Sequence, residues 1–174
     1  MGDTPRFTIE PLGSHHDRAA FSCGKPGLDG YLRQQAGQDS KRDLARVFVA
    51  SGDSDHEIAG YYSLSTLSID IGDLPAERAR KLPRYPDVPA ALLGRLAVAS
   101  GWQGKGLGKI LLADALKRLV THGNELAIHA IVVEPLDEEA DGFYRKFGFL
   151  PFPERGGRLF LPMATARQLF SAGD

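Results

Sequence analysis

The chain has 174 residues, a length that fits one domain with a sizeable core, and we expect residues 1–174 to form a single domain. Its 21 lysines and arginines nearly balance its 22 aspartates and glutamates, which argues against wholesale coating of a nucleic acid but leaves room for a local basic patch. No apolar run is long enough to span a membrane, and the early charges Asp3 and Arg6 argue against a signal peptide. The single cysteine, Cys23, excludes an internal disulfide and favours a reducing, cytoplasmic compartment.

The first half of the chain predicts short strands around one amphipathic helix. That helix places Leu28, Tyr31, Leu32 and Ala36 on one face and is expected to end near Gly37. The other predicted elements are a strand at 6–12, a helical turn at 15–20, a hairpin of strands at 46–50 and 57–65, and a short helix at 73–81. A proline-rich connection through residues 83–89 follows.

The middle of the chain, residues 92–119, predicts a strand, a glycine-rich turn and a helix in succession. Residues 92–98 are largely apolar, as in a buried strand. The helix is indicated by apolar residues at helical spacing, which are Leu111, Leu112, Ala115 and Leu119. A turn of this kind aims unpaired backbone N–H groups and the positive end of a helix at one point, which is a phosphate-binding arrangement.

Three phosphate-binding patterns compete for the glycine turn. A P-loop needs four residues between its glycines and then Gly-Lys-Ser/Thr, whereas only three separate Gly104 from Gly108 and an isoleucine follows Lys109. A dinucleotide fingerprint needs Gly-x-Gly-x-x-Gly, and the turn has Gly-x-Gly-x-Gly instead. The third pattern, Gln/Arg-x-x-Gly-x-Gly/Ala, is matched by Gln103, Gly106 and Gly108.

A second motif lies downstream of a predicted buried strand at 127–133. Asp137 is a plausible N-cap of a short helix, and Gly148 suits its C-terminal end. We expect Ala140, Phe143 and Phe147 to face the sheet, with Tyr144 about a quarter-turn away from that stripe. A last strand is predicted at 158–163.

Together, the 103–108 turn and the phrase Phe-Tyr-x-x-Phe-Gly-Phe at 143–149 resemble the GNAT acetyltransferases, which bind acetyl-coenzyme A. The resemblance covers nearly the whole chain. It implies an α/β fold of the mixed-sheet, α+β kind, in which helices flank a central twisted sheet.

Three further phrases narrow the resemblance to one subfamily. They are Phe-x-Cys-Gly-x-x-x-Leu-Asp-x-Tyr-Leu from Phe21, Pro-Ala-x-Leu-Leu-Gly-Arg-Leu-Ala-Val from Pro89, and Trp-Gln-Gly-Lys-Gly-Leu-Gly from Trp102. They are similar to the acetyltransferase toxins of type II toxin–antitoxin modules, which acetylate aminoacyl-tRNA. The resemblance implies a ribbon-helix-helix antitoxin as partner, a homodimer and no membrane association.

The resemblance also implies a set of acetyl-CoA contacts. The turn takes the pyrophosphate through backbone N–H groups, and its lysines either add charge or are merely solvated. The backbone of residues 96 and 98 pairs with the pantetheine, while both side chains are expected in the core. The expected contacts are Leu96, Ala97, Val98, Gln103, Gly104, Lys105, Gly106, Leu107, Gly108, Lys109, Tyr144 and Phe147.

Tyr144 is the candidate general acid, because a phenol of pKa ~10 is protonated at neutral pH and can donate to a thiolate of pKa ~8.5. Its alternative role is packing of the helix. No strong general base is visible; Glu134, after the second buried strand, is either a base or a solvated acid. A base is dispensable for an α-amine, whose pKa of ~8 lies below the ~10.4 of lysine, and this favours α-amine substrates.

A basic cluster precedes the proline-rich segment and consists of Arg78, Arg80, Lys81 and Arg84. It is either a solvated helix end or a surface that contacts tRNA phosphates. Arg95, inside a predicted strand, either forms a structural ion pair or joins that tRNA-binding set. Cys23 is expected to be a packed residue, and the five histidines lack paired metal spacing, so no metal is expected.

The main functional hypothesis is therefore an acetyl-CoA-dependent N-acetyltransferase toxin that acetylates the α-amine of aminoacyl-tRNA and blocks translation. Two alternatives stay open. One is a GNAT enzyme that acts on a small amine or a protein N-terminus, and the other is a non-catalytic acyl-CoA-binding regulator.

Overall fold

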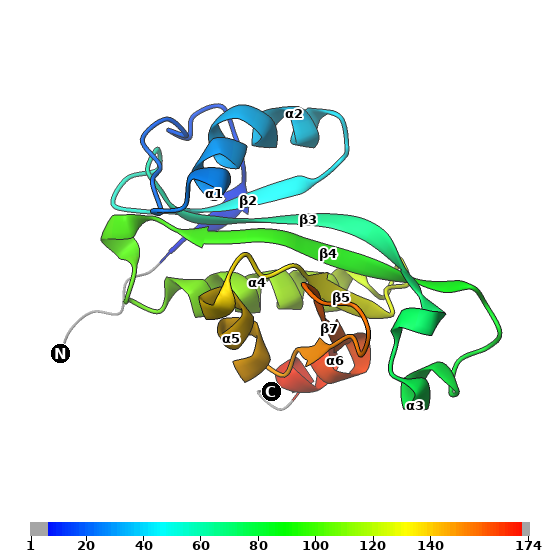
Figure 1. Ribbon diagram of the computed structural model, residues 1–174. Coiled ribbons are helices and arrows are strands. Elements are labelled where there is room, and N and C mark those ends of the chain that lie inside the picture. Colours follow the sequence, from blue (N-terminus) through cyan, green and yellow to red (C-terminus); the bar gives the residue numbers. More distant parts are fainter. Residues whose placement is uncertain (1–6, 172–174) are drawn as a thin grey trace. The chain divides into compact units, whose positions relative to one another are not determined.

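The computed structural model describes residues 7–171, which form a mixed sheet whose strands are connected along the chain by helices and loops (Figure 1). The strands are β1 (Ile9–Pro11), β2 (Arg46–Ser51), β3 (Ile58–Asp70), β4 (Asp87–Val98), β5 (Ala130–Val133), β6 (Leu150–Pro151) and β7 (Leu159–Pro162). The helices are α1 (Pro26–Gly30), the π-helix η1 (Tyr31–Gln35), α2 (Ala36–Lys41), α3 (Ala76–Ala79), α4 (Leu107–His122), α5 (Glu138–Lys146) and α6 (Met163–Ser171). Two short 3₁₀ turns, η2 (Ile71–Asp73) and η3 (Ser100–Trp102), complete the described elements. Among these helices, none is both long and apolar enough to cross a membrane.

The described strands form a seven-stranded sheet in the order β1-β2-β3-β4-β5-β7-β6. Antiparallel pairing joins β1 to β2, β2 to β3, β5 to β7 and β6 to β7. The pair β4 and β5 is parallel, with Ala90 opposite Ala130, and α4 lies in the connection between these two strands. A parallel pair requires such a crossover. The predicted mixed α/β sheet is therefore confirmed.

The described residues fall into two compact units. Unit 1 contains residues 7–64 and 95–115, and unit 2 contains residues 65–94 and 116–171. Each is described separately below. A single domain over the whole chain stays a prediction.

The core of unit 1 lies between the α1–η1–α2 helices and the strands beneath them. Leu32 and Ala36 of the helices are fully buried against Val49 of β2 and Tyr61 of β3. Figure 1 shows α1 and α2 over β2. The predicted helix ending at Gly37 is wrong in extent, because the chain starts the helix at Pro26, widens to a π-turn and continues to Lys41.

The core of unit 2 is built on β4, β5 and β7. Ala90, Val132 and Phe160 are buried together, and Phe152 packs on Phe160 with ring centroids 4.9 Å apart. Strand β4 begins at Asp87, so the proline at 89 lies within a strand and not in the predicted connection.

Several predicted boundaries differ from the structure. Strand β5 starts at Ala130, three residues later than predicted, and residues 15–20 form turns without a helix. The observed first strand, β1, is shorter than the strand predicted at 6–12, and Arg6 of that prediction lies outside the described residues. Helix α4 agrees with its apolar spacing: Leu111, Leu112 and Ala115 are buried.

Candidate active site

The glycine loop, residues 103–108, lies in unit 1 between η3 and α4. Gly104 and Gly106 have φ of +79° and +83°, a region that L side chains adopt only with strain. A Cβ built at either glycine would meet no atom within 4 Å. Here glycine is required by the backbone conformation and leaves open space beside it, as a loop that admits a ligand to its backbone needs.

The loop leads directly into the first turn of α4. Leu107, the first helical residue, is buried and anchors the turn, whereas Lys105 and Lys109 are exposed. The Ile110 N–H donates to the Gly106 carbonyl at 3.3 Å, while the three helical N–H groups before it precede any intrahelical acceptor. These groups and the positive helix end form an anion-binding arrangement.

Gln103 holds the start of the loop in place. Its side-chain Nε2 donates to the carbonyls of Cys23 and Val98, at 3.0 Å each. Gln103 was predicted as a cofactor contact, but in this structure its amide nitrogen ties the loop to the end of β4 and to the segment before α1. The spacing of the motif does not reveal this bond, because both acceptors are backbone atoms.

Trp102 adds a second anchor beside the loop. Its indole N–H donates to Glu57 Oε1 at 2.9 Å, and the Lys105 ammonium lies 4.8 Å from the centroid of its ring. The Trp102 bond and a backbone bond from Asp53 lower the pKa of the Glu57 carboxyl below 4.5. The indole contact restrains Lys105, so its charge stays at the loop.

At the end of β4, the burial of the side chains differs from the prediction. Ala97 is buried, whereas Leu96 and Val98 are only half-buried, so they are not the core residues that we expected. Alternation along the strand places Ala97 on the face that packs against the core of unit 1 and the other two on the opposite face. Gly60 of β3 makes this packing possible, because a Cβ there would lie 2.9 Å from the Ala97 carbonyl oxygen.

Tyr144 is the buried residue of α5 in unit 2. Its side chain is 6% exposed, whereas the expected sheet-facing residues Phe143 and Phe147 are only half-buried. The predicted orientation of this helix is therefore wrong by about a quarter-turn. The helix itself is confirmed: the Asp137 side chain accepts the Ala140 N–H at 2.9 Å, and Gly148 has φ of +96° after its end.

The Tyr144 ring is held by aromatic contacts with Phe143 and Phe149, whose centroids lie 5.3 and 5.4 Å away. Within residues 7–171, no hydrogen bond to its hydroxyl is found. Burial raises the pKa of the Tyr144 phenol well above 10. The group is therefore fully protonated at neutral pH and has a proton to donate.

Glu134, the candidate base, is 46% exposed and lies 3.7 Å from the Arg158 guanidinium, the two atoms being Oε2 and Nε. The carboxylate is therefore open to solvent and has a cation beside it. The structure gives no further feature that favours a base at this position.

The basic cluster lies in unit 2, on α3 and the turns that follow it. All four members are exposed, and none forms an ion pair within residues 7–171. Arg78 lies over the Phe160 ring at 5.7 Å, which fixes one end of the cluster. Tyr85, directly after Arg84, is 66% exposed, and the sequence analysis missed it. Its position in the sequence could have indicated it, because this aromatic residue stands between two prolines and next to a cation.

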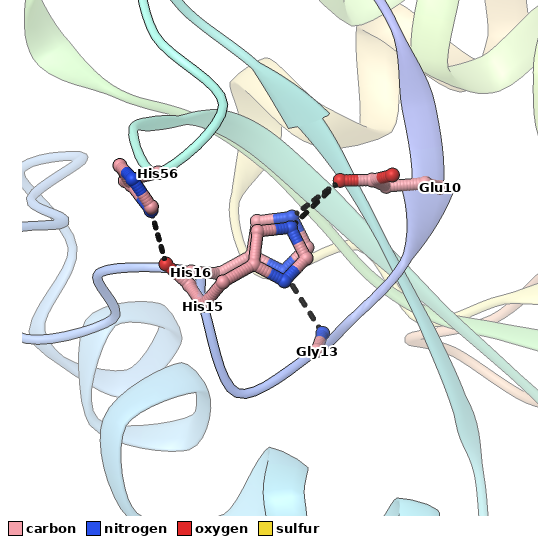
Figure 2. A network of polar contacts seen from close by, with 5 residues as sticks. All are labelled: Glu10, Gly13, His15, His16 and His56. Atoms are coloured by element: carbon pink, nitrogen blue, oxygen red, sulfur yellow. Dashed lines mark hydrogen bonds and ion pairs between the residues drawn. The ribbon is translucent and has the colours of Figure 1, made fainter.

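A compact network of polar contacts lies near the first strand (Figure 2). Glu10 Oε1 is 2.8 Å from His16 Nε2 and 3.2 Å from His15 Nε2, and these bonds lower the pKa of the Glu10 carboxyl. The three side chains are close enough to hold a metal ion. However, the Gly13 N–H donates to His16 Nδ1 at 2.9 Å, which leaves the ring proton on Nε2. A protonated Nε2 cannot ligate a metal, and the network instead fastens the loop after β1.

The described residues thus hold the predicted site in two sets. Unit 1 brings together the end of β4, the glycine loop and Arg95, and unit 2 contains Tyr144, Phe147 and the basic cluster.

Comparison with known proteins identifies the family. Residues 14–149 match the model of the acetyltransferase (GNAT) family, and the chain belongs to this family of acetyltransferases. A tRNA-acetylating toxin of Mycobacterium tuberculosis is 39% identical over 153 residues, with 88% of this chain and 90% of that protein covered. A probable toxin TacT of Sinorhizobium fredii is 35% identical over 169 residues, with 92% of this chain and 93% of that protein covered.

Several solved structures are similar to this chain over nearly its whole length. A crystal structure of a tyrosine-to-phenylalanine mutant of KacT has a TM-score of 0.89 at 29% identity, with 95% of this chain and 100% of that chain covered. AtaT complexed with acetyl-methionyl-tRNAfMet has a TM-score of 0.87 at 29% identity, covering 95% and 99% of the two chains. A tyrosine-to-phenylalanine mutant of the AtaT toxin, bound to the C-terminus of the antitoxin AtaR and to acetyl-CoA, has a TM-score of 0.80 at 27% identity, covering 96% and 99%.

Proposed function

We propose that this protein is the toxin of a type II toxin–antitoxin module, which transfers the acetyl group of acetyl-CoA to the α-amine of aminoacyl-tRNA and so blocks translation. The observation that carries this proposal is near full-length similarity to a tRNA-acetylating toxin, together with the open glycine loop at the start of α4, whose two glycines have positive φ. The complex of AtaT with acetyl-methionyl-tRNAfMet supports the same substrate class.

Acetyl-CoA supplies a thioester whose acetyl group passes to an amine, with release of the thiol. The residues suited to hold its pyrophosphate are those of the glycine loop, through the N–H groups of the first turn of α4. Two open positions, at Gly104 and Gly106, fit this role, because no atom lies where a side chain would begin. Lys105, restrained against Trp102, and the exposed Lys109 add positive charge.

Tyr144 is proposed as the general acid. The neutral amine attacks the thioester carbonyl and the C–S bond breaks; the phenol hydroxyl gives its proton to the departing sulfur, and the proton that the acylated nitrogen loses returns through solvent to the phenolate. Burial raises the pKa of the Tyr144 phenol, so the hydroxyl carries its proton at neutral pH, as a general acid must. The similar solved structures include tyrosine-to-phenylalanine mutants of KacT and of the AtaT toxin.

The acceptor is proposed to reach the enzyme through the basic cluster on α3 and its following turns. Four exposed cations that have no carboxylate partner within residues 7–171 suit tRNA phosphates, and Tyr85 offers a ring on which a base can stack. A protein of balanced net charge needs such a local patch to hold tRNA.

A ribbon-helix-helix antitoxin is the proposed protein partner, and a homodimer the proposed assembly. AtaT bound to the C-terminus of AtaR supports the first. We propose that an acidic antitoxin segment covers the basic cluster. The substrate places the enzyme in the cytoplasm.

The decisive experiment incubates the protein with radiolabelled acetyl-CoA and a pool of tRNAs, either charged or stripped of amino acids. We expect label only on charged tRNA, released by ester hydrolysis as an N-acetyl amino acid. Label on stripped tRNA, or only on free lysine and polyamines, would overturn the proposal in favour of a small-amine enzyme. Absence of any thiol release would favour an acyl-CoA-binding regulator.

A further inference from the structure

Arg95 of β4 lies over an aromatic ring in unit 1. Its guanidinium carbon is 3.6 Å from the centroid of Tyr31, close enough for direct stacking. Arg95 occupies the strand position two residues before Ala97, on the same face of β4. The side chain is therefore fixed on the strand that leads to the glycine loop.

Tyr31 is in turn held by the rest of unit 1. Its hydroxyl donates to Asp39 Oδ2 at 2.9 Å, and its ring stacks on Tyr61 with centroids 6.4 Å apart and planes 19° from parallel. Tyr61 is fixed by a 2.6 Å bond from its hydroxyl to the Leu28 carbonyl. Burial and the bond to Asp39 raise the pKa of Tyr31 to about 12, so it remains a neutral platform.

Tyr31 is also the first residue of the π-helix η1. The Ala36 N–H donates to the Tyr31 carbonyl five residues earlier, and this widened turn separates α1 from α2. π-Turns inside helices are rare and frequent at functional sites. Tyr31, at the start of this π-turn, and Asp39, eight residues later in α2, lie within hydrogen-bond distance.

Arg95 lacks a counter-ion among the residues that the structure describes. It is half-buried, yet within residues 7–171 no carboxylate pairs with it and no hydrogen bond to its guanidinium is found. Asp39, the nearest acid in this network, is engaged by the Tyr31 hydroxyl. Five N–H donors in a planar fork, partly withdrawn from water and unpaired, are suited to a phosphate.

We propose that Arg95 binds a phosphate of the acceptor end of aminoacyl-tRNA and that Tyr31, held by Asp39, is the positioning residue that holds the guanidinium in place for this contact. This inference rests on the proposed function for the identity of its ligand. Besides the exposed basic cluster of unit 2, it gives the tRNA a proposed contact in unit 1. This contact lies on β4, the strand whose end adjoins the glycine loop.

The test measures tRNA binding and turnover for Arg95→Gln, Arg95→Lys and Tyr31→Phe, with Arg46→Gln as matched control. Arg46 is an exposed arginine of unit 1 that already has a partner, Asp43. We expect Arg95→Gln to raise the KM for charged tRNA about tenfold or more, with unchanged acetyl-CoA affinity by calorimetry. The slope of log binding constant against log salt should fall by ~0.7 to 0.9 for one lost phosphate contact.

The other two variants separate charge from positioning. Arg95→Lys keeps the charge but loses the planar fork, so it should keep the salt slope and still lose affinity. Tyr31→Phe keeps the ring and releases Asp39, so it should raise the KM for charged tRNA severalfold without changing the salt slope. A merely structural role would lower the melting temperature of these variants and leave both the slope and the KM unchanged, which would overturn the inference.

The outcomes also separate this inference from the proposed function. If the wild-type enzyme acetylates charged tRNA but Arg95→Gln keeps its tRNA affinity and salt slope, only the Arg95 inference fails. If wild type binds tRNA yet acetylates only free amines, the proposed function fails, and the salt slope of Arg95→Gln still decides the contact. If wild type does not bind tRNA at all, both are wrong.

Discussion

The side-chain amide of Gln103 donates to the carbonyl of Val98 at 3.0 Å, which ties the first residue of the glycine loop to the last residue of β4. The same nitrogen reaches the Cys23 carbonyl at the same distance. One amide group thus fastens three segments of unit 1, and the loop that follows it holds two glycines at positive φ. The loop is pre-formed by this bond before any ligand arrives, which lowers the ordering cost of binding.

The first prediction tests this tether with Gln103→Glu, which keeps the shape and places a carboxylate against two carbonyls. Loss of both bonds should lower the free energy of unfolding by about 1 kcal/mol. Acetyl-CoA affinity should fall about tenfold, because the loop is no longer held. Chemical denaturation and calorimetry provide the two values. The exposed Gln38→Glu, which changes the charge of the same unit equally, should alter neither; an equal loss there would assign the effect to charge.

The second prediction concerns Gly106, whose φ of +83° disfavours any L side chain. Gly106→Ala should lower stability by about 1–2 kcal/mol from the backbone alone, and Gly106→Val should abolish measurable acetyl-CoA binding in a folded protein. Gly72→Ala is the control, because that glycine also has open space but no positive φ. Calorimetry that finds unchanged affinity in folded Gly106→Val would remove the loop from the site.

The glycine loop and α5 show how far the sequence leads. Glycine spacing and the motif residue Gln103 predicted the turn, and the cap at Asp137 predicted the helix, because both depend on local backbone chemistry. The face of α5 was predicted wrongly, because Tyr144, Phe143 and Phe147 are all aromatic. Which of them is buried depends on partners such as Phe149, which lies between α5 and β6.

The contacts around Arg95 lay beyond sequence reasoning for a different reason. Tyr31 and Arg95 are 64 positions apart, and Tyr31 begins the π-turn at residues 31–35, which no propensity indicates. Likewise, the two carbonyls that hold Gln103 have no residue-type signature. The sequence supplies the residues of the site, whereas tertiary contacts decide which of them bind ligand and which hold the others.

The third prediction concerns Tyr144. Tyr144→Phe should keep its packing on Phe149, its stability and its acetyl-CoA affinity, while kcat falls ~10²–10⁴-fold. In the wild type, the rate should rise with pH as the α-amine, of pKa ~8, loses its proton. No alkaline decline should follow below pH ~10, because burial raises the phenol pKa above its ordinary value. An amide-linked aminoacyl-tRNA resists hydrolysis over this range, and a decline near pH 9 would contradict the assignment.

The fourth prediction links Glu57 to the pH dependence of stability. Its carboxyl pKa is below 4.5 in the folded protein, chiefly because the Trp102 indole N–H donates to it. The folded state therefore binds fewer protons, and the stabilisation is present above pH ~4.5 and is lost as pH falls through the lower folded pKa. Glu57→Gln should show a smaller loss of melting temperature between pH 5 and pH 3 than wild type. Exposed Glu154→Gln serves as control, and equal acid sensitivity of wild type and Glu57→Gln would refute the linkage.

The last prediction separates charge from stacking on the proposed tRNA surface of unit 2. Replacing Arg80, Lys81 and Arg84 with glutamine should weaken tRNA binding and flatten the salt dependence by up to about one log–log unit for each lost contact. Tyr85→Ala should instead weaken binding by about 1–3 kcal/mol without changing the slope, since base stacking involves no counter-ion release. The matched variant Tyr85→Phe keeps the ring and should bind as wild type does. Quenching of a 2-aminopurine placed along the acceptor end of the tRNA would report the stack directly, and should be lost only in Tyr85→Ala. If the alanine variant binds with wild-type affinity and quenches equally, Tyr85 is an ordinary exposed loop residue and the tRNA surface is electrostatic alone.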